Sequence, residues 1–114
     1  MIYRIADQAD WEAAQASGYF ASADLAAEGF IHTSEQAQVL ETARRYYAGR
    51  AALVLLEIDE AVLSAANVRQ KREWVASREA FFTHVYGPVP LGAITRCWPF
   101  AEKGGAFALP KELF

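Results

Sequence analysis

The 114-residue chain has one cysteine, Cys97, and only two histidines. A single cysteine excludes an internal disulfide and a zinc site built from cysteines. The longest apolar run, residues 51–56, is far shorter than a membrane span. The net charge of −3 gives no basic footprint for nucleic acid at the level of the whole domain. We therefore expect a cytoplasmic protein that binds neither membrane nor nucleic acid.

The hydrophobic content of 54% is sufficient for the core of one compact domain. No repeat, linker or low-complexity segment divides the sequence, so we expect a single domain over residues 1–114. Its opening residues, Met1-Ile2-Tyr3-Arg4, predict a first strand and not a leader peptide.

The hydrophobic pattern predicts two strand–helix units followed mainly by strands. We expect helices at residues 8–17, after Asp7 and before Gly18, and at residues 34–48, before Gly49, with a loop or broken turn at 19–29. We expect strands at residues 2–5, 52–58, 68–75, 81–86 and 91–98, and a further short strand that carries His32. The tail from Pro99 is expected to wrap over the surface on Phe100, Phe107 and Phe114. This order favours an α+β fold over a doubly wound parallel sheet.

The most informative segment is Gly29–Gln36, with the sequence GFIHTSEQ. It predicts a short buried strand that brings His32 to the start of a helix, with Thr33 and Gln36 at the spacing of a capping box. A helix start offers unpaired amides and a partial positive charge, which favour an anion. An imidazole at that point adds a proton carrier. We expect Thr33, Ser34 and Gln36 to help bind a ligand there.

Both histidines lie in apolar strand sequences, Ile31-His32-Thr33 and Thr83-His84-Val85. If both point into one cleft, they can form an acid–base pair or orient a phosphate-like group. Because Ser34, Gln36 and Tyr86 accompany them, we favour a functional site over two structural, hydrogen-bonded histidines.

Glu73 precedes Trp74, and a carboxylate beside an indole is expected to have a raised pKa, as a general acid or base requires. The alternative is an exposed glutamate paired with neighbouring basic residues. His32, His84 and Glu73 also match a metal triad in residue type, but no local spacing of ligands supports one, and we expect no metal site.

Arg4 and Tyr47 are further candidates for ligand contacts. A guanidinium in the first strand can fork onto a phosphate or carboxylate, and it can equally face outward or form an internal ion pair. Tyr47 can stack on a flat ring, although packing in the core is the commoner role for such a residue.

The chain resembles the bacterial domain-of-unknown-function family 952. The segments that carry the resemblance are Ile2-Tyr3-Arg4-Ile5, Trp11, Gly29–Ser34 with Gln36, and Phe82–Pro88. The family typically has a proline before the second histidine, where this chain has Thr83. Glu73 corresponds to a glutamate usually found ahead of that histidine.

This resemblance implies a fold and not a reaction. The family's fold is similar to the ADP-ribosyltransferase type, an α+β fold with a curved split sheet, two main helices and a nucleotide cleft between the halves. The element order also resembles RNA 2′-phosphotransferases, in which a strand with histidine and then serine leads into a helix. Transferases of this fold place a histidine or arginine on the first strand and a glutamate or arginine late in the chain; Arg4 and Glu73 offer these side chains here.

We therefore expect a small transferase or hydrolase that binds NAD or an ADP-ribose-like nucleotide, with NAD as the candidate cofactor. In this interpretation His32 holds a ribose hydroxyl or phosphate, Arg4 neutralises charge, and His84 with Tyr86 lines the opposite wall. Glu73 polarises the acceptor or stabilises an oxocarbenium-like sugar. The alternative is a non-catalytic module that binds a small anion or a partner protein.

Overall fold

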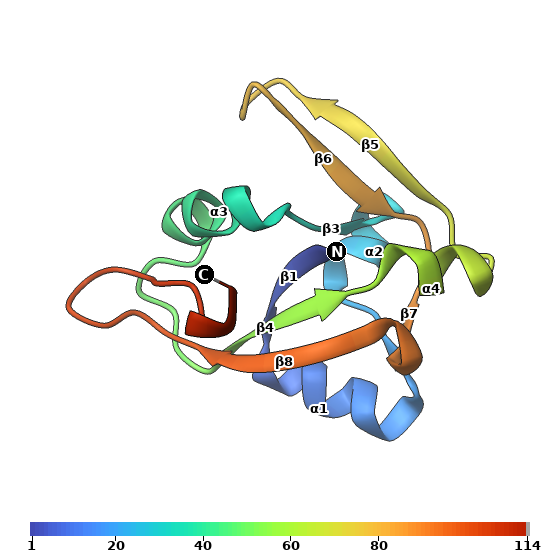
Figure 1. Cartoon of the computed structure of the whole chain (residues 1–114), viewed down its shortest axis with the longest axis horizontal. Helices are drawn as coiled ribbons and strands as arrows, with labels where there is room; N and C mark the ends of the chain where they lie inside the picture. Colours follow the sequence, from blue (N-terminus) through green and yellow to red (C-terminus); the bar gives the residue numbers. More distant parts are fainter. Residues whose placement is uncertain (114) are drawn as a thin grey trace.

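The computed structural model in Figure 1 describes residues 1–113. Its strands are β1 (Ile2–Asp7), β2 (Tyr19–Phe20), β3 (Ile31–His32), β4 (Leu53–Ile58), β5 (Gln70–Val75), β6 (Ala80–Val85), β7 (Val89–Pro90) and β8 (Ile94–Phe100). Its α-helices are α1 (Gln8–Ser17), α2 (Ala23–Glu28), α3 (Val39–Tyr46) and α4 (Glu60–Ala65). All pairings between these strands are antiparallel, so the α+β class predicted from the sequence is confirmed.

The strands form two three-stranded sheets, ordered β1-β4-β8 and β3-β6-β5, and a small β2-β7 pair. Strand β4 is central in the first sheet, and every one of its residues is buried, as its apolar sequence predicts. In the second sheet, β5 and β6 form a long hairpin that extends away from the first sheet (Figure 1). The two sheets meet where Tyr3 of β1 exchanges backbone hydrogen bonds with Ser34, the second residue after β3, at 2.8 Å each.

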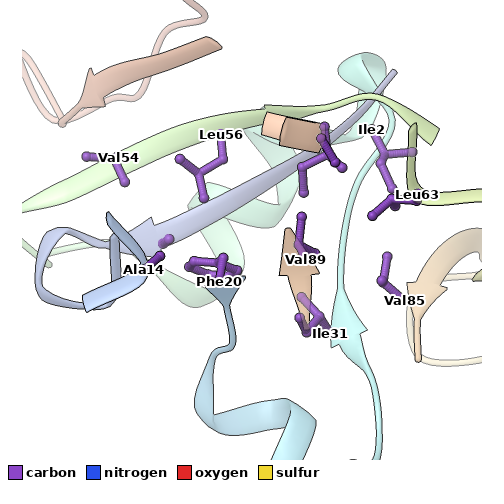
Figure 2. Close-up of a cluster of buried hydrophobic side chains, with 12 residues drawn as sticks. Ile2, Ala14, Phe20, Ile31, Val54, Leu56, Leu63, Val85 and Val89 are labelled. Carbon is purple, nitrogen blue, oxygen red and sulfur yellow. The ribbon is translucent and has the colours of Figure 1, made fainter. Parts of the chain in front are cut away.

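Side chains along β4 point alternately to the two faces of the β1-β4-β8 sheet, and those on both faces are buried. Val54 and Leu56 pack in a cluster with Phe20 and Ile31 (Figure 2). Ile58 belongs to the same cluster. Leu53 and Leu55, on the other face, pack with residues from α3 and from the C-terminal tail. Each fully buried leucine or isoleucine side chain contributes roughly 1.5–3 kcal/mol. Burial of β4 on both faces thus places the first sheet at the centre of the core.

The first helix agrees closely with its prediction. It covers Gln8–Ser17 and ends at Gly18, which has a φ of 91° and gives the left-handed conformation that glycine adopts without strain. Asp7 makes no side-chain cap hydrogen bond; its carboxylate pairs with Arg50 instead. Residues 19–29 were predicted as a loop or a broken turn of helix, and the helical alternative is the closer one, because α2 occupies Ala23–Glu28; the short strand β2 was not predicted.

The helix predicted at residues 34–48 corresponds to α3 and begins later than predicted. A single 3₁₀ turn at Gln36–Gln38 comes first, and α3 starts at Val39. The capping box at this junction is formed by Glu35 and Gln38, with the backbone N–H of Glu35 donating to Oε1 of Gln38 at 2.9 Å. The helix therefore does not cap on Thr33.

The capping box predicted for Thr33 and Gln36 is wrong. The hydroxyl of Thr33 donates to the carbonyl oxygen of Thr83 at 2.7 Å and links β3 to β6. Gln36 is exposed, and its amide donates to the carbonyl oxygen of Leu113. Gln36 thus anchors the C-terminal tail and takes no part in the junction beside His32.

The tail begins two residues later than predicted, since Pro99 and Phe100 belong to the edge strand β8. Phe100 is buried and stacks on Phe107 with ring centroids 5.0 Å apart, so both anchor the tail. Phe114 lies outside the described residues. Within residues 1–113, no helix is long and apolar enough to cross a membrane.

Candidate functional site

A cleft with a volume of about 650 Å³ is lined by residues from both sheets. Strand β1 contributes Tyr3, Arg4 and Ile5, while β3 and β6 contribute His32 and His84. Helices α2 and α3 and the turn of the β5–β6 hairpin complete the lining. A cavity of this size accommodates a nucleotide or another small organic ligand.

The two histidines face each other across β3 and β6. His32 is the antiparallel register partner of His84, and the ring centroids lie 5.3 Å apart in an edge-to-face arrangement. Side chains that are directly opposite in an antiparallel pair share one face of the sheet. The condition set by the sequence, that both histidines reach one cleft, is met.

Asp24 on α2 links Arg4 to His32. Its Oδ2 accepts from Nη1 of Arg4 at 2.8 Å, from the backbone N–H of His32 at 2.9 Å and from Nδ1 of His32 at 2.9 Å. Burial opposes ionisation of this carboxyl, but the hydrogen bonds from His32 and the charge of Arg4 outweigh burial and hold the pKa of Asp24 well below its usual range. Arg4 is therefore an internal ion-pair partner.

Arg4 has one buried nitrogen without a hydrogen-bond partner among the described residues. This nitrogen is Nε, whereas Nη1 also donates to the carbonyl oxygen of His32 at 3.1 Å. Sequence reasoning missed Asp24, although the serine at position 22 followed by an acidic residue is a typical helix start and marks this loop as structured.

His84 is held by Glu73. Its Nδ1 lies 3.0 Å from Oε1 of Glu73, and the hydroxyl of Tyr86 donates to the same oxygen. Glu73 pairs in register with Phe82, so His84 is the diagonal neighbour of Glu73 on the same face of the β5–β6 ladder.

The raised pKa predicted for Glu73 is wrong. Hydrogen bonds from Tyr86 and then His84 lower the pKa of the Glu73 carboxyl. Trp74, the adjacent residue, points to the other face and packs edge-to-face on Phe81 at 5.2 Å. Because neighbouring residues on a strand face opposite sides, the indole does not desolvate the carboxylate.

The imidazole of His84 is closely packed. Its side chain is 8% exposed, and the ring of Phe30 stacks on it with centroids 4.1 Å apart. The Glu73 carboxylate accepts from Nδ1–H, and in the tautomer with its proton on Nδ1 the imidazole presents Nε2 as an acceptor. This Nε2 is buried and has no hydrogen-bond partner among residues 1–113.

The remaining predicted residues divide into two groups. Thr33, Ser34 and Tyr47 line the cleft; Ser34 Oγ lies 3.1 Å from Thr42 Oγ1, and the Tyr47 hydroxyl donates to the carbonyl oxygen of Ile5 at 3.2 Å. The residues predicted for the site that lie outside the cleft lining are Gln36, Glu73 and Tyr86. Tyr86 therefore does not form the opposite wall; it supports Glu73 from behind.

Arg78 is a cleft residue that the sequence analysis did not identify. It lies in the turn of the β5–β6 hairpin, and its Nη2 donates to Thr42 Oγ1 at 3.1 Å. An arginine in a hairpin turn is usually solvated, so no sequence signal distinguishes this one.

The metal triad considered for His32, His84 and Glu73 does not form. In the part of the chain that the structure describes, no group of three or more histidine, cysteine, aspartate or glutamate side chains is arranged to hold a metal ion. Nδ1 of His84 is instead occupied by Glu73.

Two kinds of comparison place this chain among known proteins. It is similar to the crystal structure of protein CC0527 from Caulobacter crescentus, a structural-genomics target, with a TM-score of 0.86, 36% identity, and coverage of 98% of this chain and 96% of that one. The solution NMR structure of CC0527 gives a TM-score of 0.72 at 37% identity, covering 93% and 89%. No curated protein gives a significant match. The family described as "Protein of unknown function (DUF952)" matches residues 5–97, and the chain therefore belongs to this family.

Proposed function

We propose that the cleft binds a small phosphorylated nucleotide of the NAD or ADP-ribose class, with a ribose hydroxyl at Nε2 of His84. The observation that carries this proposal is Nε2 of His84, which has no hydrogen-bond partner among the described residues although the side chain is only 8% exposed. A buried polar atom without a partner costs about 1–3 kcal/mol. A ligand that satisfies Nε2 recovers this free energy on binding.

The hydrogen-bonding character of the cleft favours a sugar hydroxyl over other groups at this point. Glu73 fixes Nε2 of the neutral His84 ring as an acceptor, so its partner has to be a donor. Nε of Arg4, also buried and unpartnered, is a donor and requires an acceptor. Ribose meets both requirements, because one of its hydroxyl groups can donate to Nε2 of His84 while a neighbouring oxygen atom accepts from Nε of Arg4.

The ADP-ribosyltransferase-like fold remains part of this proposal. It is supported by two antiparallel sheets that both contribute to one cleft, and by an arginine on the first strand at that cleft. The role of Glu73 changes from the expectation, because the carboxylate lies behind His84 and outside the cleft lining. In this proposal Glu73 is a positioning residue that sets the tautomer and orientation of His84.

In a transferase or hydrolase, Nε2 of His84 would accept the proton of the attacking hydroxyl or water. The second candidate is a non-catalytic module for a small anion. It is favoured by the position of Glu73, since the carboxylate expected to stabilise a sugar cation does not reach the cleft.

Titration calorimetry with NAD, ADP-ribose, AMP and free phosphate tests the proposal. We expect binding of at least one nucleotide by the wild type, a loss of at least tenfold in affinity for His84→Ala, and no change for Arg44→Ala, which removes an exposed arginine paired with Glu41. Equal affinity in His84→Ala contradicts the proposal. Release of nicotinamide from NAD with a bell-shaped pH profile favours the enzyme, and binding without turnover favours the anion module.

A further inference from the structure

We infer that Arg78, in the turn between β5 and β6, recognises a phosphoryl group in the cleft. This inference rests on the proposed function, because it assigns the phosphate end of the same nucleotide ligand. Figure 1 shows the turn of this hairpin on the α3 side of the molecule. Val75, Ser77 and Arg78 all line the cleft. The hairpin tip is therefore part of the site, at the opposite sheet from Arg4.

Arg78 differs from the other arginines of the cleft in its partners. Arg4 pairs with Asp24, and Arg50 pairs with Asp7. Within residues 1–113, Arg78 has no carboxylate within ion-pair distance; its hydrogen bond goes to the neutral hydroxyl of Thr42 at 3.1 Å. An anion forms a charge-assisted hydrogen bond with a guanidinium that is about twice as strong as one to a neutral group. An anionic ligand is thus able to replace Thr42 as the partner.

The guanidinium is already held in place. Its central carbon lies 4.6 Å from the ring centroid of Phe82 and 5.6 Å from that of Tyr46. These contacts, with the hydrogen bond to Thr42, join the hairpin to α3 across the cleft. A guanidinium that is oriented before binding loses less conformational entropy when the ligand arrives.

Three residues with hydroxyl groups line the cleft on this side: Thr42, which accepts from Arg78, Ser34, whose Oγ lies 3.1 Å from Thr42 Oγ1, and Ser77, which precedes Arg78 in the hairpin turn. A phosphoryl group offers several acceptor oxygens, and it matches a forked guanidinium together with neighbouring hydroxyl donors better than a single carbonyl does. Since Asp24 already neutralises Arg4 and contacts His32, the phosphate is assigned to Arg78 and the sugar hydroxyl to His84.

Binding of inorganic pyrophosphate, measured by ³¹P NMR and calorimetry, tests the inference without a nucleotide. We expect the wild type to bind pyrophosphate, with affinity reduced tenfold or more in Arg78→Ala and Arg78→Gln, partly retained in Arg78→Lys, and unchanged in Arg72→Ala. Arg72 is the matched control because it belongs to the same hairpin but pairs with Glu35 outside the cleft. Thermal melts establish that each variant is folded.

Pyrophosphate binding that is absent from the wild type, or equally tight in folded Arg78→Ala and Arg78→Gln, overturns the inference. Nucleoside binding separates this failure from that of the proposed function. In one outcome, the binding of adenosine and of ADP-ribose both depends on His84, but ADP-ribose binds more tightly than adenosine by the same factor in Arg78→Ala as in the wild type. The phosphate assignment alone is then wrong. If pyrophosphate binds through Arg78 while no nucleotide depends on His84, the inference holds and the proposed function is wrong.

Discussion

The carboxylate of Glu73 and Nδ1 of His84 lie 3.0 Å apart across the β5–β6 ladder, so the second histidine of the cleft is oriented by a residue outside it. Nε2 consequently becomes the free atom of the imidazole.

Removal of Glu73 is expected to change the tautomer of His84. In the wild type the carboxylate accepts from Nδ1–H, whereas in Glu73→Ala this preference is lost and the fraction with a proton on Nε2 rises. Long-range ¹H–¹⁵N NMR of the imidazole nitrogens measures the change. An unchanged His84 pattern in a folded Glu73→Ala variant contradicts the assigned role, and Glu79→Ala, a glutamate in the hairpin turn, is the control.

Asp24→Ala is expected to destabilise the protein by about 3 kcal/mol, because it leaves Arg4, whose side chain is only 13% exposed, without its carboxylate partner. Urea denaturation measures the free energy of unfolding. Asp10→Ala, which removes another carboxylate of the cleft lining, is the comparison and is expected to cost much less. Equal costs for the two variants are incompatible with a central role for Asp24.

Stability at acid pH is expected to depend on Glu57. This residue is 3% exposed and receives hydrogen bonds from Arg96 at 2.7 and 2.9 Å, from Thr95 at 2.7 Å and from Tyr3 at 2.9 Å. The hydrogen bonds from Arg96, assisted by those from Thr95 and Tyr3, outweigh burial and lower the pKa of Glu57 from 4.5 to about 2. Its stabilising contribution is thus fully present above pH 4.5 and is lost as the pH falls toward 2.

The difference in unfolding free energy between wild type and Glu57→Gln isolates this contribution from other carboxylates with lowered pKa values, such as Asp24. We expect the difference to shrink between pH 4.5 and pH 2, by on the order of 3 kcal/mol. Denaturant titrations at several pH values measure it. A difference that does not vary with pH shows that Glu57 is not ionised against Arg96 as described.

Leu55→Ala is expected to cost about 2–5 kcal/mol, since this side chain is fully buried at the centre of β4 and its loss leaves a cavity between the sheet and α3. Leu40→Ala is the matched control, because Leu40 on α3 is 39% exposed. Thermal and urea unfolding compare the two. Similar costs would mean that β4 is not the central strand of the core.

The parts of the fold that the sequence predicted are those with strong local signals. The uninterrupted apolar stretch of β4 and the glycine at the end of α1 were sufficient for correct predictions. The short strand β2 has no such local signal, because it is formed by pairing with β7, about seventy residues later in the chain. The helix start was misplaced because Glu35 and Gln38 have the same capping-box spacing as Thr33 and Gln36, and Thr33 is drawn into a tertiary hydrogen bond with β6.

The same distinction applies to the site. His32 and His84 could be named from their sequence context, and their register pairing brings them together. The partners of these histidines could not be identified, since Asp24 reaches His32 from another helix and Glu73 reaches His84 diagonally across a ladder. Arg78 acquires its position only when the hairpin turn meets α3.

The most direct test of the account is titration of the ¹⁵N-labelled protein with ADP-ribose and NAD while the imidazole nitrogens of His84 are observed by long-range NMR. We predict that Nε2 of His84 shifts in a saturable manner as it accepts a hydrogen bond, while Nδ1 keeps its proton and its bond to Glu73. Saturable nucleotide binding that leaves both His84 nitrogens unchanged, or no binding of either nucleotide, would contradict the account.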